Sequence, residues 1–428
     1  MNNDRWNQFF AVLLALAAAV RAWLMGPMWL DKAFLSLSYS DRIARGGGVL
    51  LAGQVEPYEA FLNPFWVTLF AVFGRFNLSE TQLQAPIGIL LYALLAVLVF
   101  RLIVDRCSTP IALIVTMLIG LAPVASAARD GSDAIFLAVL SLWSSSRVSR
   151  DLNMASERSG TAVLLGILVL SGRFAWLVAV GLAFLSMRKG YWKNMVVVVA
   201  TTMMLVGFRW VLFGTWYPPV LAGPVHGLAA FQWLPSLGIA AVAGVAMAWH
   251  RKRLEIPFLW VLMVGVFSAW FWGHETGGFG VSMIPAVGVL LMFCAELLAA
   301  HTAVWFGATL GVLIAVVDGG RTETTVSAVQ HERLTNFHQG RGMGRFLLWR
   351  FEEDDQIVVH RPGVIGYYAR RSLIDLSGVL HGRTINPSDA LIQDPVAVLP
   401  ARSIVSQKAQ RIPMGTEWPQ ALEDRYKQ

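Results

Sequence analysis

The residue types that could do chemistry stand at the ends of apolar segments. An acid and a base, Asp31 and Lys32, directly follow the first apolar run, and Arg173 lies between two half-length apolar runs in LSGRFAWL. A carboxylate can accept a proton, and a guanidinium group offers a planar fork of donors to an anion. Ionisable residues near a membrane core are costly and usually line a cavity. The sequence therefore predicts a polar cavity at a membrane surface.

Composition places these residues in a membrane protein. Of the 428 residues, 56% are hydrophobic and only 14% are charged, whereas roughly a quarter of the residues in soluble domains are charged. The net charge of +7 is typical of a polytopic membrane protein with basic cytoplasmic loops, so we expect no nucleic-acid partner. Two cysteines, Cys107 and Cys294, make neither a disulfide framework nor a metal-binding pattern.

Apolar runs that could form membrane helices occur eleven times. A bilayer core takes about 20 apolar residues, and fewer suffice where protein shields the helix. The first run lacks a small-residue cleavage site, so we expect it to be retained as a span. The run at 61–76 is short, is interrupted by Asn63 and Pro64 and is rich in aromatic residues, which indicates a helix at the membrane interface. The eleven candidates are 8–28, 85–104, 110–127, 133–146, 160–172, 174–187, 194–213, 233–249, 256–272, 281–300 and 302–317.

Basic residues orient these spans. With 61–76 at the interface, the loops on the N-terminal side carry Arg5, Arg101, Arg106, Arg147, Arg150, Arg158, Arg188, Lys189, Lys193, Arg251, Lys252 and Arg253. The opposite loops are longer in total but carry fewer basic residues, namely Lys32, Arg42, Arg45, Arg75, Arg129 and Arg173. The positive-inside rule places the N-terminus in the cytoplasm, and eleven spans then place the region after about residue 318 outside.

The composition becomes polar after Val317. Short apolar runs such as QIVVH and SLIDLSG then alternate with Gly and Pro, a pattern typical of a small soluble α/β module. We expect a membrane domain at 1–317, with a first extracytoplasmic loop at 29–84, and an extracytoplasmic α/β domain at 318–428. The segment GRGMGR at 340–345 is not interpreted as a phosphate-binding glycine loop, because no strand precedes it.

The predicted topology places the unusual polar residues together at the outer face. In addition to Asp31, Lys32 and Arg173, these are Arg129, Asp130, Asp133, Trp216, Tyr217, His274 and Glu275.

Several of them also have a purely structural interpretation. Lys32 and Arg129 can snorkel to the headgroups, and Asp133 can cap the following helix. His274 and Glu275 can be ordinary loop polarity, since they lack metal-site spacing.

Seven segments carry a resemblance to a known family. In chain order they are DKAFLSLSYSDRIARGGG, NPFW, RDGSDAIFL, LSGRFAWL, FGTWYPP, GHETGGFGVSMIP and PGVIGYYARRSLIDLSGVLHG. They resemble segments of GT-C glycosyltransferases, in the branch that includes the terminal mycobacterial arabinofuranosyltransferase. The first is similar to Asp-Asp-Ala-Tyr-Ile-Ser-x-Arg-Tyr, and the last to the soluble-domain signature Gly-x-Ile-x-Tyr-Tyr-Ser-x-x-x-x-Ile-Asp. No single segment is decisive, but their shared order is specific.

The resemblance implies a polytopic α-helical enzyme of a bacterial inner membrane. Such an enzyme transfers a sugar, a pentofuranose or a hexose, from a polyprenyl-phosphate donor to a glycan, lipid or protein acceptor of the cell envelope, with inversion. Asp31 is then the general base. The residues expected to bind the substrates are Lys32, Tyr39, Trp66, Arg129, Asp133, Arg173, Tyr217, His274 and Glu275. The aromatic members can also be simple interfacial anchors.

The sequence departs from the family pattern at four places. Lys32 replaces the family's second acid, Ser38 and Val281 replace arginines, and Phe174-Ala175 replaces Pro-Asp. An ammonium group beside Asp31 opposes a second cation, so we expect no cofactor and do not favour a divalent metal.

The departures keep a second hypothesis open. It is a catalytically inactive GT-C-like homologue that binds a lipid-linked glycan or acts as a scaffold subunit. A transporter is less favoured, because transporters usually show internal symmetry and broken helices at the midplane.

Overall fold

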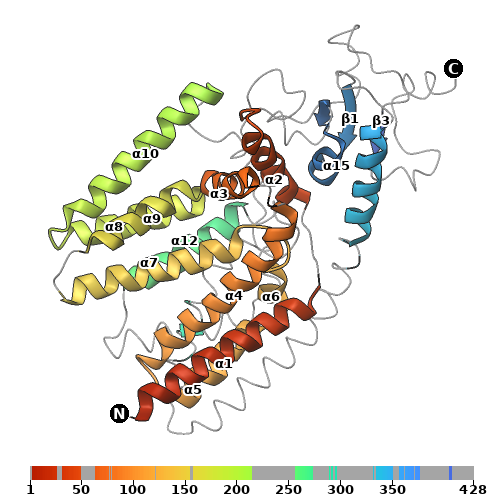
Figure 1. Cartoon of the computed structure of the whole chain (residues 1–428). Coiled ribbons are helices and arrows are strands. Elements are labelled where there is room, and N and C mark those ends of the chain that lie inside the picture. Colours follow the sequence, from red (N-terminus) through yellow and green to blue (C-terminus); the bar gives the residue numbers. More distant parts are fainter. Residues whose placement is uncertain are drawn as a thin grey trace, which may run out of the picture. The chain divides into compact units, whose positions relative to one another are not determined.

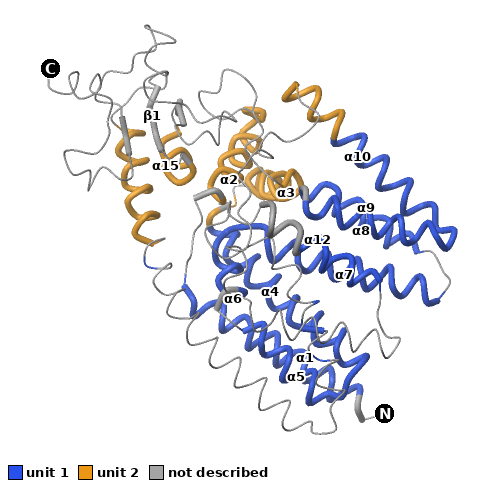
Figure 2. The backbone as a smooth tube through the Cα atoms, turned by 180° about the vertical axis from the view of Figure 1, so that it is seen from behind, with its two compact units in different colours: residues 1–28, 82–205, 223–331 blue, residues 29–81, 206–222, 332–428 orange. Residues whose placement is uncertain are grey.

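The protein folds into two compact units, each described by itself below. The computed structural model describes residues 2–26, 31–49, 63–76, 78, 80–120, 122–154, 158–214, 256–272, 289, 291–292, 295, 331, 334–349, 356–360, 362–370, 372–375 and 404–406. Figure 2 colours the units separately: unit 1 comprises residues 1–28, 82–205 and 223–331, and unit 2 comprises 29–81, 206–222 and 332–428.

Unit 1 is a bundle of helices (Figure 1). Helix α7 packs against α8, α9 and α12, while α9 packs against α8 and α12, and α1 packs against α5 and α6. The elements of the bundle are α1 (Asn2–Leu24), α4 (Glu80–Val104), α5 (Thr109–Met117), η1 (Leu118–Gly120), α6 (Ala122–Ala127), α7 (Ala134–Met154), α8 (Ser159–Leu170), α9 (Arg173–Met187), most of α10 (Trp192–Phe213) and α12 (Ile256–Trp272).

Three of the described helices are long and apolar enough to cross a membrane, namely Asp4–Leu24, Thr81–Val104 and Trp192–Phe213. Large apolar side chains such as Leu16 and Val20 on α1, and Met203 and Val211 on α10, are exposed. Lipid contact accounts for such an apolar surface.

Seven of the predicted spans coincide with single helices of the bundle, and the span predicted at 110–127 covers α5, η1 and α6. The spans predicted at 233–249 and 302–317, and most of the span predicted at 281–300, lie outside the described residues. The total of eleven spans therefore stays a prediction.

The segment predicted as one span at 110–127 is divided in the structure. Helix α5 ends at Met117, a 3₁₀ turn follows, and α6 begins at Ala122. Pro123 explains the division, because proline lacks a backbone N–H and fits the first turn of a helix better than its interior. The Arg21 Nε of α1 donates a hydrogen bond to the carbonyl of Gly120 at 3.3 Å and so satisfies a backbone group at the break.

Helices α9 and α12 approach each other closely at a glycine. A Cβ atom on Gly181 would lie 2.0 Å from Nε1 of Trp260. The same Nε1 donates to the Leu177 carbonyl at 3.1 Å. The indole therefore occupies the space that a side chain at position 181 would need.

Unit 2 combines helices with a small sheet. Its described elements are α2 (Asp31–Ala44), α3 (Pro64–Arg75), a helix at 334–349, β1 (Gln356–His360), α15 (Pro362–Ala369), β2 (Ser372–Asp375) and β3 (Ile404–Ser406). The strands are parallel in the order β2-β1-β3. Helix α15 connects β1 to β2, as parallel neighbours require a crossover.

Two apolar runs that suggested an α/β module coincide with strands. QIVVH is β1, with Val358 opposite Ile374 of β2 and Ile404 of β3. The first four residues of SLIDLSG are β2. An α/β domain covering all of 318–428, and its boundary with the membrane domain, stay predictions.

Candidate functional site

The predicted site residues fall in both units. Asp31, Lys32 and Tyr39 belong to α2 of unit 2, and Trp66 belongs to α3 of the same unit. In unit 1, Arg129 and Asp133 lie in the segment between α6 and α7, and Arg173 is the first residue of α9. The side chains of Asp31, Lys32 and Arg173, and all of Tyr217, His274 and Glu275, lie outside the described part of the chain.

The segment that carries Asp31 and Lys32 is helical. Asp31 is the first residue of α2, where a negative charge is favoured by the helix dipole. Phe34, Leu37 and Tyr39 are fully buried. This buried set explains why a segment that reads as a polar loop folds as a helix: its apolar residues pack inside unit 2.

The glycine run after α2 ends the helix. The N–H of Gly46 donates to the Ile43 carbonyl at 3.0 Å, and the N–H of Gly47 donates to the Arg42 carbonyl at 2.8 Å. This is the Schellman pattern, which needs a left-handed residue after the helix. Gly46 supplies it with a φ of 81°. The glycines of the segment ARGGG thus have a structural role.

The segment NPFW starts α3. The Asn63 side chain accepts a hydrogen bond from the N–H of Trp66 at 2.9 Å, and Pro64 occupies the first turn. Ser40 of α2 donates to the Val67 carbonyl at 2.9 Å and so links the two helices. Trp66 is 3% exposed, and its ring centroid lies 5.0 Å from that of Phe70. The expected sugar-binding residues Tyr39 and Trp66 are therefore core side chains of unit 2.

An aromatic cluster holds α2 against the C-terminal elements of unit 2. We define it as Phe34, Phe337, Tyr367 and Tyr368. The Phe34 ring centroid lies 5.6 Å from that of Phe337, 5.5 Å from Tyr367 and 6.2 Å from Tyr368. Aromatic pairs at these separations stabilise a fold beyond the area that they bury. Phe34 is one helical turn from Asp31, so the cluster fixes the beginning of α2.

An ion pair links the other end of α2 to the same elements. Asp41 lies 3.8 Å from Arg370, the residue after α15, and 2.9 Å from Arg45 within α2. The side chain of Arg45 is 56% exposed and that of Arg370 is 50% exposed. Solvent and salt therefore screen both ion pairs. The aromatic cluster therefore contributes more to holding α2 than the ion pairs do.

The segment ARDGSD in unit 1 is folded tightly onto its neighbours. Arg129 donates from Nε to the Gly26 carbonyl at 3.1 Å and lies over the Trp23 ring, 5.7 Å from its centroid. Burial lowers the pKa of Arg129, although a guanidinium group keeps its charge in proteins. One Arg129 nitrogen is thus bound to a backbone carbonyl, and snorkelling of this side chain to the headgroups stays a prediction.

Local hydrogen bonds order the segment that leads into α7. The buried Asp130 accepts the N–H of Ser132 at 2.7 Å, and Ser132 accepts the N–H of Ala134 at 3.3 Å. The Asp133 carbonyl accepts the N–H of Leu137 at 2.9 Å. The Ser132 side chain therefore binds the first N–H of α7, and capping of this helix by the Asp133 side chain stays a prediction.

Arg173 stands at the beginning of a helix. Gly172 precedes it with a φ of 105°, and the Gly172 carbonyl accepts the N–H of Trp176 at 2.8 Å. The first backbone N–H groups of a helix and its dipole favour an anion at this end. An arginine in this place adds a full positive charge to the partial charge of the helix.

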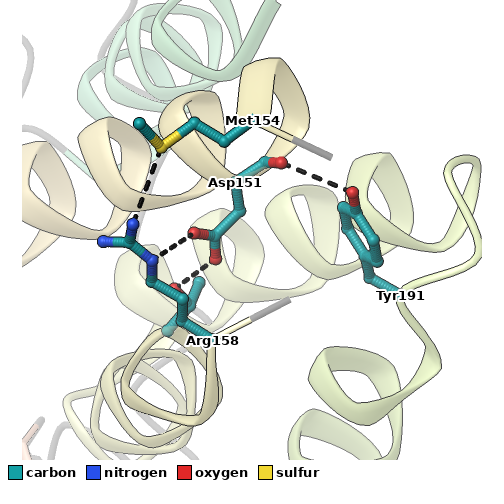
Figure 3. Close-up of polar contacts among 5 residues, drawn as sticks. Asp151, Met154, Arg158 and Tyr191 are labelled. Atoms are coloured by element: carbon teal, nitrogen blue, oxygen red, sulfur yellow. Dashed lines mark hydrogen bonds and ion pairs between the residues drawn. The ribbon is translucent and has the colours of Figure 1, made fainter. Parts of the chain in front are cut away.

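A buried carboxylate that sequence analysis did not select lies in unit 1. Asp151, near the end of α7, is 2% exposed and accepts a hydrogen bond from the Thr161 hydroxyl at 2.6 Å. Figure 3 shows Arg158 beside it, with Nε 3.9 Å from Oδ1, and Tyr191 donating to its backbone carbonyl at 3.4 Å. Asp151 therefore joins the end of α7 to α8 and to the residue before α10.

Sequence reasoning could not find this junction or the aromatic cluster. Arg158 is one of many basic residues in the predicted loops, and Asp151 stands among polar residues in SRDLNM. Phe34 stands among apolar residues in AFLSL, which is the one sign in the sequence that it could be buried. Its partners, however, lie some 300 residues later in the chain.

Among the side chains that the structure describes, no group of three or more His, Cys, Asp or Glu residues could hold a metal ion. Asp31, His274 and Glu275 are outside that set, so metal independence stays a prediction.

Comparison with known proteins identifies the fold. No protein family and no curated protein sequence matches the chain. Among solved structures, the chain is similar to ArnT from Cupriavidus metallidurans bound to undecaprenyl phosphate, with a TM-score of 0.58, 13% identity and coverage of 90% of this chain and 89% of that one. Apo ArnT from the same organism gives a TM-score of 0.57, 14% identity and coverage of 86% of both chains.

A third similar structure is the Archaeoglobus fulgidus oligosaccharyltransferase tethered to an acceptor peptide. Its TM-score is 0.56 at 13% identity over 87% of this chain, and the match spans only 64% of the oligosaccharyltransferase. At these identities the likeness concerns the fold. The arabinofuranosyltransferase branch expected from sequence motifs is not among these structures. The chain is an integral membrane protein that shares the fold of ArnT and of the oligosaccharyltransferase.

Proposed function

We propose that this protein is an inverting glycosyltransferase that uses a polyprenyl-phosphate-linked sugar. The sugar, a pentofuranose or a hexose, passes to a glycan, lipid or protein acceptor of the cell envelope at the outer face of a bacterial inner membrane. The choice of a polyprenyl-phosphate donor follows from the resemblance to the branch of the terminal arabinofuranosyltransferase. The N-terminus is cytoplasmic, and the C-terminal domain at 318–428 is extracytoplasmic.

One observation carries the proposal. The chain shares its fold, over 90% of its length, with a protein that was crystallised with undecaprenyl phosphate. The helix that begins at Asp31 supports it, because α2 is braced at both ends by the C-terminal elements of unit 2. A helix held at both ends fixes the backbone of the residue that carries the carboxylate, and a general base needs a fixed place.

The reaction needs few groups. The acceptor oxygen attacks the anomeric carbon while Asp31 takes the acceptor proton. The bond between the anomeric carbon and the phosphate oxygen breaks, and the polyprenyl phosphate leaves with the bonding electrons. Cationic groups stabilise that leaving anion. We assign this role to Lys32, Arg129 and Arg173, of which Arg173 also has the N-terminus of α9 beside it.

The remaining residues would hold the acceptor and the sugar. Asp133, His274 and Glu275 are assigned to the acceptor or to charge balance with Arg173. Tyr39, Trp66 and Tyr217 are assigned to the sugar or the prenyl chain. Because Tyr39 and Trp66 are buried, their role would be to support the residues that line the site, without direct contact with the sugar.

The proposal is tested with the full chain in lipid nanodiscs. Polyprenyl-phosphate donors carrying labelled arabinofuranose or a hexose are supplied with envelope acceptors, and release of polyprenyl phosphate is followed by ³¹P NMR. We expect turnover with one donor class, unchanged by EDTA. Loss of turnover with EDTA and its return with magnesium or manganese would contradict the metal-independent form of the mechanism.

A non-catalytic role is the second candidate. Lys32 in place of the family's second acid and the burial of Tyr39 and Trp66 favour a protein that binds a lipid-linked glycan as a scaffold. Saturable binding of undecaprenyl phosphate without turnover of any donor in the same nanodiscs would select this alternative.

A further inference from the structure

Two arginines on one helix of unit 2 converge on a single tyrosine. The Cζ atoms of Arg341 and Arg345 lie 5.6 Å and 5.9 Å from the ring centroid of Tyr368 on α15. They are four residues apart in the helix at 334–349, so they are neighbours on its surface, where like charges repel. The fold thus places two positive charges at one ring, and cation–π attraction to a single ring offsets only part of that repulsion.

Neither arginine is neutralised within the described part of the chain. The acid Asp41 in this unit is paired with Arg45 and Arg370, and no ion pair or hydrogen bond of Arg341 or Arg345 occurs among the described residues. Nε of Arg341 is buried without a hydrogen-bond partner there. Buried donors, and above all charged ones, nearly always have a partner in native structures.

The helix is fixed at this place by its glycines. Gly340 and Gly344 are buried, and a Cβ on Gly344 would lie 2.7 Å from the Ile365 carbonyl oxygen of α15. The close contact between these two helices at Gly344 places Arg341 and Arg345 near the ring of Tyr368. The segment GRGMGR is therefore helical, and its glycines serve packing while its arginines supply charge.

We propose that Arg341, Arg345 and Tyr368 form a binding site for a phosphate group. A guanidinium group carries its N–H donors in one plane as a fixed fork, which matches the oxygens of a phosphate. The phenol of Tyr368 adds a hydroxyl donor at the same place. Burial raises the pKa of Tyr368, while the two arginines lower it, so this hydroxyl stays protonated and able to donate at neutral pH.

This proposal does not rest on the proposed function, although Tyr368 contacts Phe34, which is one helical turn from Asp31. The phosphate group can belong to a lipid headgroup or to a free phosphate, and one set of variants separates the two sources. Acidic side chains of the protein itself could compete with phosphate for the two arginines. Four acidic residues, Glu352 to Asp355, follow the helix in the sequence and lie outside the described residues. If their carboxylates neutralised the arginines, the wild type would bind no phosphate here.

The test uses the full chain with Lys32→Gln, Arg129→Gln and Arg173→Gln as background, because these changes remove the cations assigned to the donor. Binding of inorganic phosphate is measured by titration calorimetry in detergent. Retention of phosphatidic acid relative to phosphatidylcholine is measured by native mass spectrometry. Arg341→Gln and Arg345→Gln are introduced singly and together, and the exposed Arg150→Gln is the matched control.

A free-phosphate site predicts saturable binding of inorganic phosphate that each Arg341 or Arg345 variant weakens by about 10-fold or more, whereas Arg150→Gln leaves it unchanged. A lipid-headgroup site predicts no saturable binding of inorganic phosphate. It predicts instead that the protein retains phosphatidic acid in preference to phosphatidylcholine, and that the double variant loses this preference. Arg345→Lys keeps the charge without the fork and should give an intermediate loss. Absence of both kinds of binding, or binding that the folded double variant retains, would overturn the proposal.

Discussion

The ring of Phe34 stacks on the ring of Phe337, with centroids 5.6 Å apart and an interplanar angle of 26°. This contact joins the helix that begins at Asp31 to the helix at 334–349. It holds the first turn of α2, and with it the backbone of the proposed base, against the C-terminal elements of unit 2.

Phe34→Leu tests that influence. Phe34 is fully buried, and loss of its ring contacts should lower the free energy of unfolding by about 1–3 kcal/mol. If the ring also orients Asp31, kcat should fall by about 10-fold or more while KM changes little. Thermal unfolding and initial rates are measured on the same nanodisc preparation.

The matched control is Phe258→Leu, which removes an equally buried ring from unit 1. This variant should lose stability but keep kcat. Equal effects of both variants on kcat would mean that the aromatic cluster serves general stability and does not position Asp31.

Asp41→Asn should have a small effect. The side chains of its two partners are about half exposed, and ion pairs open to solvent contribute about 1 kcal/mol or less. Chemical denaturation with urea at low and at 0.5 M salt, a concentration at which screening acts over roughly 4–5 Å, should show a loss that shrinks as salt rises. A loss of several kcal/mol that is independent of salt would show that this ion pair, and not the aromatic cluster, holds α2.

Gly181→Ala should separate α9 from α12. The added methyl would lie 2.0 Å from Nε1 of Trp260, and overpacking of this kind costs about 1–3 kcal/mol or more. Trp260→Phe should partly rescue the variant, because it removes the clashing atoms. Double-mutant analysis of thermal unfolding should give a favourable coupling energy, and strictly additive effects would exclude the contact.

Thr161→Val should destabilise the junction shown in Figure 3. The change keeps the shape of the side chain but removes the hydroxyl that donates to Asp151 at 2.6 Å. A buried carboxylate that loses a donor costs about 1–3 kcal/mol. Thr161→Ser, which keeps the hydroxyl, is the control. Similar unfolding midpoints for the Val and Ser variants would show that this hydrogen bond has little weight.

The sequence predicted the helices that lipid contact requires. The runs at 174–187 and 194–213 differ by at most two residues from α9 and α10 at each end, because a long apolar run in a bilayer has few other conformations. The segment 29–48 was not predicted as a helix. Phe34 and Leu37 acquire their burial from partners distant in sequence, and hydrophobic periodicity over one half-polar segment cannot show this.

The candidate site was predictable only as a set of residue types. Charge and position in the topology selected Asp31, Arg129 and Arg173, but the engagement of Arg129 by Gly26 and Trp23 depends on tertiary packing. The convergence of Arg341 and Arg345 on Tyr368 likewise requires the contact of two helices at Gly344. A glycine-rich basic segment alone is ambiguous between a loop, a linker and a helix.

The most direct measurement is donor turnover by Asp31→Asn beside Asp41→Asn, the same change on the same helix. We expect Asp31→Asn to bind undecaprenyl phosphate like the wild type but to lose turnover by about 10²–10⁴-fold, while Asp41→Asn stays active. Full turnover by a folded Asp31→Asn protein would contradict the assignment of Asp31 as the base.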